Sequence, residues 1–499
     1  MYSDPVSGVN PPAYAQLGLP TLPELGTQQQ FKLLNEWIHL CDTKHNCTSV
    51  QEHEGRVNGM PTRVLHVGTV ENPCLRLVET GDTIKGKYVA LSHCWGKLES
   101  HQRFITSADN LDDRKKEIRL NEMPNSFQDA VIATRALGVA YLWIDSLCII
   151  QGDDADWKAE SAKMEEVFSS AYCAIAASSA RSSLEGFLGD RVPRACATVH
   201  PSQGSVLYLA EAIDDFQGHV EQSVLNTRGW VLQERALSRR TLHFTSSQVY
   251  WECGQGVYCE TLAQLRNPQS QFLGDSSFPN LGLQYYKDER IQLVQHLYRV
   301  YCALELTKSA DRSQAILGLQ KRLSRTFESR ADYGVICGYF ERTILWQAKT
   351  SSSLSRIPYG DERAVPSWSW MECIGEIRYM DIPFRQVSWT GNPKNPTENV
   401  PEGAEWDGQL TAEASQLLIE EDELLSRAVI DCSAFTFDSA TWRCVVVGKS
   451  KVGDESGDIV HYVLLIRPLG GSAQVYERVG VGKLLGTHIS RGTTTVYLR

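Results

Sequence analysis

The chain has 499 residues, of which 42% are hydrophobic and 22% are charged, and its formal net charge is −11. This length exceeds what one hydrophobic core usually serves, so we expect two or three domains, and the composition is typical of a globular protein. The negative charge is spread along a sequence without a basic run, which argues against a nucleic-acid partner.

Targeting and membrane features are also missing from the sequence. The first twenty residues have no basic start followed by an apolar core, so they do not read as a secretory signal. The longest apolar stretch, VAYLWIDSLCII, is interrupted by Asp145 and is shorter than the roughly 20 residues that span a bilayer. The 14 cysteines lie in strings typical of buried core, where a thiol acts as a small hydrophobe. We therefore expect a cytoplasmic protein with reduced cysteines and no membrane span.

The N-terminal part predicts a helix around FKLLNEWIHLC and strands at TRVLHVG and LRLVET. Cys41, His45, Cys47 and His53 are close in this part of the sequence. Their spacing, C-x3-H-x-C-x5-H, is not a familiar zinc pattern, and Cys253 and Cys259 have even less support as ligands. We expect no metal.

The middle region alternates strands and helices. Tyr88–Leu91 predicts a strand that ends in small and polar residues, a helix follows Pro124 and stops at Gly138, and Tyr141–Ile144 predicts a strand that ends at Asp145. A helix from about 154 to 170 and a buried strand at AYCAIAAS complete the pattern. This order predicts a parallel α/β sheet, and such sheets bind ligands at the carboxyl ends of their strands.

From about residue 256 the pattern changes to long helices, near 284–308 and 313–329, and then to a strand-rich tail with many tryptophans. The stretch 392–408 predicts a surface loop, PSWSW predicts packing, and VGVGKLLG does not fit a phosphate-binding loop. The predicted organisation is an N-terminal helical and strand extension (1–80), an α/β domain (81–255) and a helical, then β-rich, C-terminal region (256–499).

Three blocks in the α/β region resemble the heterokaryon incompatibility (HET) domain of filamentous fungi: YVALSHCWG, LWIDSLCIIQGDDADWKAESAKMEEVF and RGWVLQERALSRRTLHF. Weaker similarity lies in CDTKHNC before them and in DRSQAILGL and VPSWSW after them. The resemblance implies a parallel-sheet core remotely like the TIR fold, and a role in non-self recognition and programmed cell death. Because some TIR domains cleave NAD+ at the nicotinamide–ribose bond, it also implies NAD+ hydrolase activity, with NAD+ as substrate and no cofactor.

In that comparison Trp157-x-x-Glu160 resembles the segment that carries the catalytic glutamate. At 100° per residue, Glu160 falls inside the apolar stripe formed by Trp157, Met164, Phe168 and Ala171. A carboxylate among apolar neighbours needs a partner or a cleft. Glu160 is thus either the catalytic acid, stabilising a ribosyl cation, or one half of a salt bridge to Arg135, Arg228 or another basic residue.

The remaining candidate residues surround the strand ends. Ser92, His93, Trp95 and Gly96 either line a nucleotide pocket or form a buried turn, and the family more often has tyrosine where His93 stands. Asp145 either holds a ribose hydroxyl or caps the next turn and bonds Arg228. Arg228, Trp230 and Glu234 belong to a helical block that we expect to seal the sheet, with an internal ion pair of Arg228 or Glu234, and to contribute to the pocket only secondarily.

Two other functions stay open at this point. The domain can be a non-catalytic module that self-associates or binds a partner incompatibility protein, or a biosynthetic enzyme that acts on a fungal metabolite with Ser92, His93 and Asp145 as acid–base groups. The expected ligand is a nucleotide or small molecule in either enzymatic reading.

Overall fold

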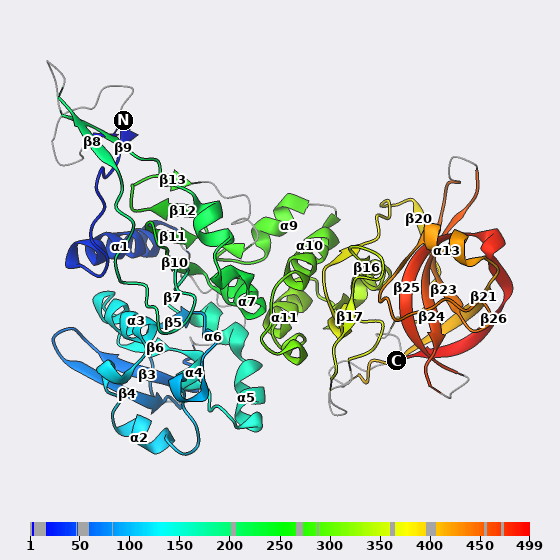
Figure 1. Ribbon diagram of the computed structural model, residues 1–499, viewed down its shortest axis with the longest axis horizontal. Coiled ribbons are helices and arrows are strands. Elements are labelled where there is room, and N and C mark those ends of the chain that lie inside the picture. The colour runs from blue at the N-terminus through cyan, green and yellow to red at the C-terminus, as the bar shows by residue number, and fades with distance from the viewer. Residues whose placement is uncertain are drawn as a thin grey trace. The chain divides into compact units, whose positions relative to one another are not determined.

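The computed structural model divides the chain into two compact units, Met1–Tyr285 and Tyr286–Arg499 (Figure 1). It describes residues 2–3, 16–45, 47, 59–81, 83–200, 206–265, 273–286, 289–359, 365–395, 406–453, 457–470 and 474–499. His53 and most of the predicted loop at 392–408 lie outside the described residues.

The first unit is built on a nine-stranded sheet in the order β13-β12-β11-β10-β7-β5-β6-β3-β4. The four central strands, β10, β7, β5 and β6, are mutually parallel, and antiparallel pairs extend the sheet on both sides. The predicted α/β class with a parallel core is confirmed. The strands are β3 (Arg63–Gly68), β4 (Pro73–Glu79), β5 (Tyr88–Ser92), β6 (Tyr141–Trp143), β7 (Cys173–Ala176), β10 (Arg240–Phe244), β11 (Val249–Cys253), β12 (Gly256–Cys259) and β13 (Gln264–Leu265).

Helices cover both faces of this sheet. They are α1 (Gln28–Leu40), α2 (Leu111–Lys116), α3 (Asn125–Ala136), α4 (Asp145–Cys148), α5 (Asp154–Ser161), α6 (Met164–Ser170) and α7 (Gly229–Leu237). The chain leaves β5 towards β6 through α3, and then crosses back past β5 to β7 through α6. Since crossovers are right-handed, these opposite directions put α3 and α6 on opposite faces. Figure 1 shows this arrangement, with α1 beside α3 and α7 beside α6.

The reversal of direction gives the sheet a switch point at the carboxyl ends of β5 and β7, where α/β proteins bind ligands. All five residues of β5 are buried, as expected for a strand covered on both faces. Ser92 is the last residue of β5 and Asp145 comes two residues after β6, so both predicted sites lie at this edge of the sheet.

The helix predicted from 154 to 170 is two helices, α5 and α6, separated at Ala162 and Lys163. The two pieces pack on different surroundings. Polar contacts bind α5 to the start of β3, where Arg63 pairs with Asp156, whereas Met164 and Phe168 of α6 enter the apolar core. A single straight helix could not make both the polar contacts of α5 and the apolar contacts of α6.

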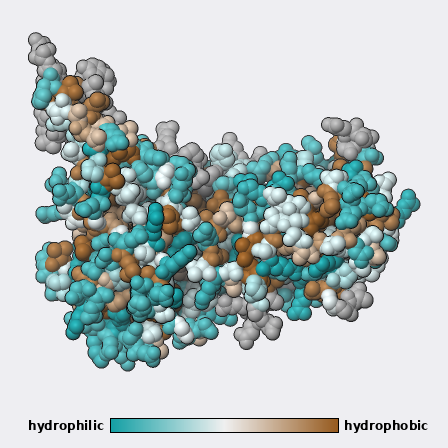
Figure 2. Space-filling view, in the orientation of Figure 1, coloured by the Kyte–Doolittle hydropathy of each residue, from teal (hydrophilic) through white to brown (hydrophobic). Residues whose placement is uncertain are grey.

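A small sheet of β1 (Tyr2–Ser3), β2 (Gln16–Leu17), β8 (Cys196–Val199) and β9 (Leu207–Ala210) also belongs to the first unit. Val199 and Leu209 of this sheet are exposed, and apolar residues gather there in Figure 2, while hydrophilic residues predominate over most of the face shown.

The second unit begins with helices and ends in a seven-stranded sheet. Strands β23, β24, β25, β26 and β21 pair in a closed ring, to which β20 and β22 are added. The helices are α9 (Asn280–Tyr286), at the unit boundary, α10 (Ile291–Cys302), α11 (Leu317–Thr326), α12 (Phe340–Ile344) and α13 (Glu421–Arg427). The large sheet consists of β20 (Val387–Trp389), β21 (Leu410–Leu417), β22 (Ala428–Ile430), β23 (Arg443–Ser450), β24 (Val460–Pro468), β25 (Val475–Leu485) and β26 (Ile489–Leu498).

Three two-stranded antiparallel sheets lie between these parts in the sequence: β14 (Ala331–Asp332) with β15 (Val335–Ile336), β16 (Trp346–Ala348) with β19 (Ile377–Tyr379), and β17 (Ser355–Arg356) with β18 (Cys373–Ile374). Trp368 and Trp370 of the PSWSW stretch are fully buried, which confirms that these tryptophans pack the core. In the part of the chain that the structure describes, no helix combines the length and the apolar character needed to cross a membrane.

Candidate functional site

Ser92 and His93 occupy the switch point, and both are buried. The Ser92 hydroxyl donates a hydrogen bond to the Glu234 carboxylate of α7. His93 Nδ1 lies 3.9 Å from Asp145 Oδ1, at the end of the neighbouring strand β6. The structure therefore brings together four of the predicted residues, Ser92, His93, Asp145 and Glu234, from three separate sequence blocks. We call them the strand-end cluster.

Glu234 is the most strongly perturbed carboxyl group of this cluster. Burial raises its pKa to about 7, and the charge of Asp145 acts in the same direction, while the Ser92 hydroxyl and the Arg228 guanidinium oppose the rise. The group is thus poised to change its protonation state near neutral pH. A carboxyl group tuned in this way is suited to proton transfer or to stabilising a transient cation.

His93 is held neutral at the same edge. Burial lowers its pKa to about 4, although the Asp145 carboxylate favours the charged form. Its ring meets the edge of Phe127 at 5.0 Å between centroids, and its buried Nε2 has no hydrogen-bond partner among the described residues. The turn does not satisfy its own polar groups, which favours the ligand-binding interpretation of SHCWG over the purely structural one.

Asp145 links the two strand ends and is the accessible member of the cluster, with 31% of its side chain exposed. Its Oδ1 accepts the Ser146 N–H at 2.6 Å, and its Oδ2 accepts the Trp95 Nε1–H at 2.8 Å. The carboxylate thus bonds the backbone in the first turn of α4, although the residue at the N-cap position of that helix is Ile144. Trp95 is half-buried, and the Asp145 carboxylate holds one edge of its ring through the Nε1–H bond.

Gly96 ends the strand-end turn with a left-handed backbone, φ +84°. A Cβ atom at this position would overlap the side chain of Ser182. The turn accordingly needs glycine both for its conformation and for the close approach of the 182 segment.

The helix α7 carries Trp230 and Glu234 of the third block. Arg228 precedes the helix, is half-buried, and places its positive charge near His93, Cys94 and Glu234. Trp230, one turn before Glu234, meets the ring of Trp157 at 6.4 Å in a T-shaped contact. The two tryptophans thereby couple α7 to α5.

Glu160, the acid that the resemblance singles out, is buried with 5% exposure, as its place in the apolar stripe predicts. Its Oε1 accepts hydrogen bonds from Lys163 Nζ at 2.9 Å and from Thr62 Oγ1 at 2.8 Å. Lys163 also donates to Thr62, which closes a small polar triangle at the start of β3. The basic partner is therefore Lys163, one turn along the same chain segment, and neither Arg135 nor Arg228.

Two further polar residues at this edge were not predicted. Ser146 follows β6 and Ser178 follows β7, and the hydroxyl group of each is buried without a hydrogen-bond partner among the described residues. Together with His93 Nε2, they place an unsatisfied polar atom just beyond each of three neighbouring parallel strands. In the sequence, both serines come shortly after an apolar strand run, and this position is the feature that could have predicted them.

A second group of potential ligands lies at the opposite edge of the sheet. Cys41, His45, Cys47 and Cys253 have side-chain ligand atoms within 4.8 Å of one another. Cys253 pairs in register with Arg240, the first residue of β10, whereas the strand-end cluster lies beyond the last residues of the parallel strands. The two groups are thus separate sites.

Comparison with protein families identifies the region that holds the strand-end cluster. The family described as "Heterokaryon incompatibility protein (HET)" matches residues 88–234, from the first residue of β5 to Glu234 itself. No curated protein and no solved structure matches the chain. The predicted resemblance is confirmed, and residues 88–234 are a HET domain.

Proposed function

We propose that this HET-domain protein acts in fungal non-self recognition and programmed cell death, and that its strand-end cluster hydrolyses NAD+ at the nicotinamide–ribose bond. The observation that carries the proposal is the Glu234 carboxyl group, with a pKa of about 7, held by Ser92 at the switch point of the sheet. Residues from all three blocks of the HET domain meet there.

The reaction requires little from the protein besides charge and position. The C1′–N bond breaks, its electron pair leaves with neutral nicotinamide, and the ribose becomes an oxocarbenium-like cation that water captures at C1′. The water gives up one proton, and the products are ADP-ribose and nicotinamide. An ionised carboxylate next to the ribose stabilises the cation, and the same group can accept the proton from water.

Glu234 suits this role better than Glu160. The carboxylate of Glu160 is already neutralised by the Lys163 ammonium at 2.9 Å and bonded to Thr62, so less of its charge is free to act on a substrate. Among the described residues, the only direct hydrogen-bond donor to Glu234 is a neutral hydroxyl, and Glu234 shares its surroundings with a second carboxylate, Asp145. We therefore propose Glu160 as a positioning residue that fixes α5, and Glu234 as the catalytic residue.

The neighbouring groups fit a nucleotide ligand. His93 is neutral, so its unpartnered Nε2 can donate or accept a hydrogen bond according to its tautomer. The Trp95 indole, anchored through its N–H by Asp145, offers a flat face for stacking. Asp145 is exposed enough to accept a bond from a ribose hydroxyl without leaving its helix start.

The test is nicotinamide release from NAD+ by the purified full-length protein, both dilute and clustered through a fused oligomerising tag, followed by chromatography. We expect Glu234→Gln to lower the rate about 10²–10⁴-fold, the usual range for loss of one acid–base group. Glu160→Gln keeps a hydrogen-bonding side chain against Thr62, so we expect it to retain most of the activity. Glu122→Gln, at an exposed glutamate, is the matched control.

The two glutamates give opposite outcomes that separate the alternatives. Activity lost in Glu160→Gln but kept in Glu234→Gln would move the reacting carboxylate to α5. A wild-type protein that releases no nicotinamide in either assembly state would contradict NAD+ cleavage and favour a self-associating module, whose death activity survives both substitutions.

A further inference from the structure

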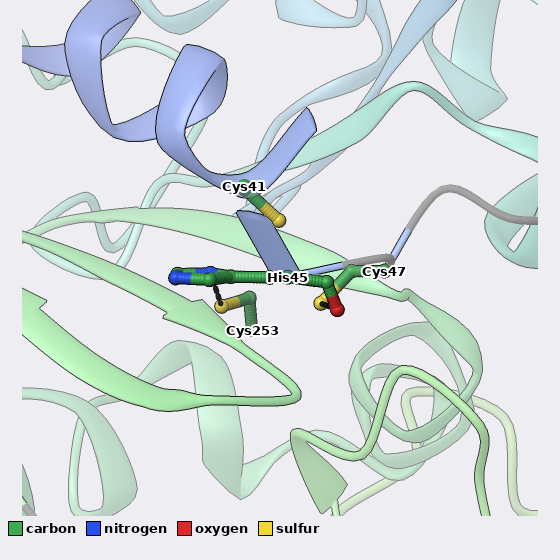
Figure 3. A group of neighbouring side chains, drawn as sticks. All are labelled: Cys41, His45, Cys47 and Cys253. Atoms are coloured by element: carbon green, nitrogen blue, oxygen red, sulfur yellow. Dashed lines mark hydrogen bonds between the residues drawn. The ribbon is translucent and has the colours of Figure 1, made fainter. Parts of the chain in front are cut away.

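The Cys41–His45–Cys47–Cys253 group combines residues that are distant in the sequence. Cys41 ends α1, a π-helical turn carries the chain to His45, and Cys47 follows two residues later. Cys253 is the last residue of β11. Figure 3 shows the three sulfur atoms around the side chain of His45, with His45 Nδ1 3.5 Å from Cys253 Sγ.

These distances fit one tetrahedral metal ion. Zn–S bonds of about 2.3 Å and Zn–N bonds of about 2.0 Å put the ligand atoms of such a site roughly 3.5–3.8 Å apart. The four ligand atoms of this group all lie within 4.8 Å of one another, so shifts of side-chain torsions bring them to a common centre. Three thiolates and one imidazole are a standard structural zinc set, Cys3His.

From this geometry we infer that Cys41, His45, Cys47 and Cys253 bind a structural Zn²⁺ ion. The three cysteines are buried at 0%, 3% and 1% exposure, and all are free thiols. Four protein ligands fill the tetrahedral shell and leave no open position for water or substrate. The ion is therefore structural rather than catalytic.

The four proposed ligands have outer contacts of the kind that surround zinc-bound thiolates and imidazoles in proteins. The turn after Cys253 directs backbone N–H groups to sulfur, from Gly254 to Cys47 and from Gln255 to Cys253. The ring of His45 stacks on Tyr258 of β12 at 5.9 Å between centroids and 19° between planes. Hydrogen bonds to the sulfurs and a packed imidazole are the outer contacts that orient metal ligands.

An independent clamp holds the ligand-bearing turn to the same strands. Asp42, next to Cys41, forms an ion pair with Arg240 of β10 and accepts a hydrogen bond from the Tyr172 hydroxyl at 2.7 Å. Arg240 is the register partner of Cys253. The turn 41–45 is thus fixed over the end of β11 even without the ion, which gives the group a preformed geometry.

The ion joins segments on both sides of the HET match. Cys41, His45 and Cys47 precede residue 88, and Cys253 follows residue 234. A metal bond between them ties the end of α1 to the β11–β12 hairpin and closes the chain around the whole HET domain. The N-terminal extension is then a part of the domain's folded body.

The test is the zinc content of the full-length protein, purified under reducing conditions and measured by plasma mass spectrometry. We expect about one Zn²⁺ per chain. Cys253→Ser and Cys47→Ser should each lower the content at least five-fold. Cys259→Ser is the matched control, because Cys259 is equally buried in the adjacent strand β12 but lies outside the group, and it should keep its zinc.

A measurement on the wild-type chain covers the case in which the variants fail to fold. After chelation, titration with Co²⁺ should give the intense d–d absorption of a tetrahedral ion together with a thiolate-to-cobalt charge-transfer band. A wild-type protein with less than a tenth of an equivalent of zinc and no such spectrum would overturn the inference. So would equal zinc loss in Cys259→Ser, or a disulfide between Cys253 and Cys41 or Cys47 in the alkylated, digested protein.

Discussion

Replacing Glu234 by glutamine should remove activity and stabilise the fold at the same time. The carboxylate and the amide have nearly the same shape, and the amide oxygen still accepts the hydrogen bond from Ser92. What changes is the charge. In the wild-type protein, burial and the Asp145 carboxylate disfavour the ionised form of Glu234, so ionisation near pH 7 destabilises the folded state.

The magnitude follows from the shift of the pKa from 4.5 to about 7, which corresponds to about 3 kcal/mol at most. Glu234 is half-buried, so solvent screens part of this penalty and we expect about 2 kcal/mol. The sign depends on pH. Below the unfolded pKa both states hold the proton and the penalty is absent. It grows as the pH rises from 4.5 to 7, and it is constant above the folded pKa.

The assay is thermal or urea unfolding of wild type and Glu234→Gln at several pH values between about 5 and 8. The free-energy difference should widen in favour of the variant by about 2 kcal/mol, equivalent to roughly 3–6 °C in the unfolding midpoint of the first unit. His93 also titrates on the acid side, with a pKa lowered to about 4, but it does so in both proteins and cancels in the difference. A variant that is less stable at pH 8 than wild type, or a difference that does not change with pH, would refute the assigned environment of Glu234.

Three further predictions follow from individual contacts. The rate of nicotinamide release should rise with pH through about 7, as Glu234 ionises. The midpoint of this rise should move down by about 0.5–1 pH unit in Asp145→Asn and up by the same amount in Ser92→Ala, because the Asp145 charge raises the pKa of Glu234 and the Ser92 hydroxyl lowers it. Gly96→Ala should lower the free energy of unfolding in urea by about 2–4 kcal/mol, because it places a Cβ atom on a left-handed backbone and against Ser182. An unchanged unfolding midpoint would contradict the described turn. Chelation of zinc should lower the first unit's unfolding midpoint by several degrees and leave the second unit's transition in place in calorimetry, because the proposed ligands all belong to the first unit.

The parts of the structure that local sequence patterns determine were predictable. The run Tyr88–Leu91 in β5 is apolar throughout because helices cover the strand on both faces, and Gly138 marks the end of α3 because its φ of +70° suits few other residues. The alternation of these elements then predicts the sheet edge at which both Ser92 and Asp145 lie.

Contacts between distant segments were not predictable from spacing. The spacing of Cys41, His45 and Cys47 does not predict a zinc site, and the fourth proposed ligand, Cys253, follows more than 200 residues later in a strand without a metal-binding pattern. The helix containing Glu160 fits one amphipathic stripe, yet it breaks because Thr62 and Lys163 provide a polar site for its first half. The spacing of apolar residues shows which side of a helix is apolar, but it does not show which segment each turn of the helix packs against.

The unfavourable environment of Glu234 can persist because the next residue holds α7 in place. Successive helical side chains point about 100° apart, so Arg235 faces the sheet interior while Glu234 faces the strand ends. Arg235 makes paired bonds to Glu221 at 2.7 and 2.8 Å and to Glu252 at 2.8 and 3.0 Å, and His243 supports Glu252 at 2.9 Å. Leaving one of these buried charges unpaired costs about 3–5 kcal/mol, which exceeds the roughly 2 kcal/mol that turning Glu234 out into water would recover. Rotation of α7 is therefore unfavourable, and the carboxyl group stays against Ser92 with a pKa near neutrality.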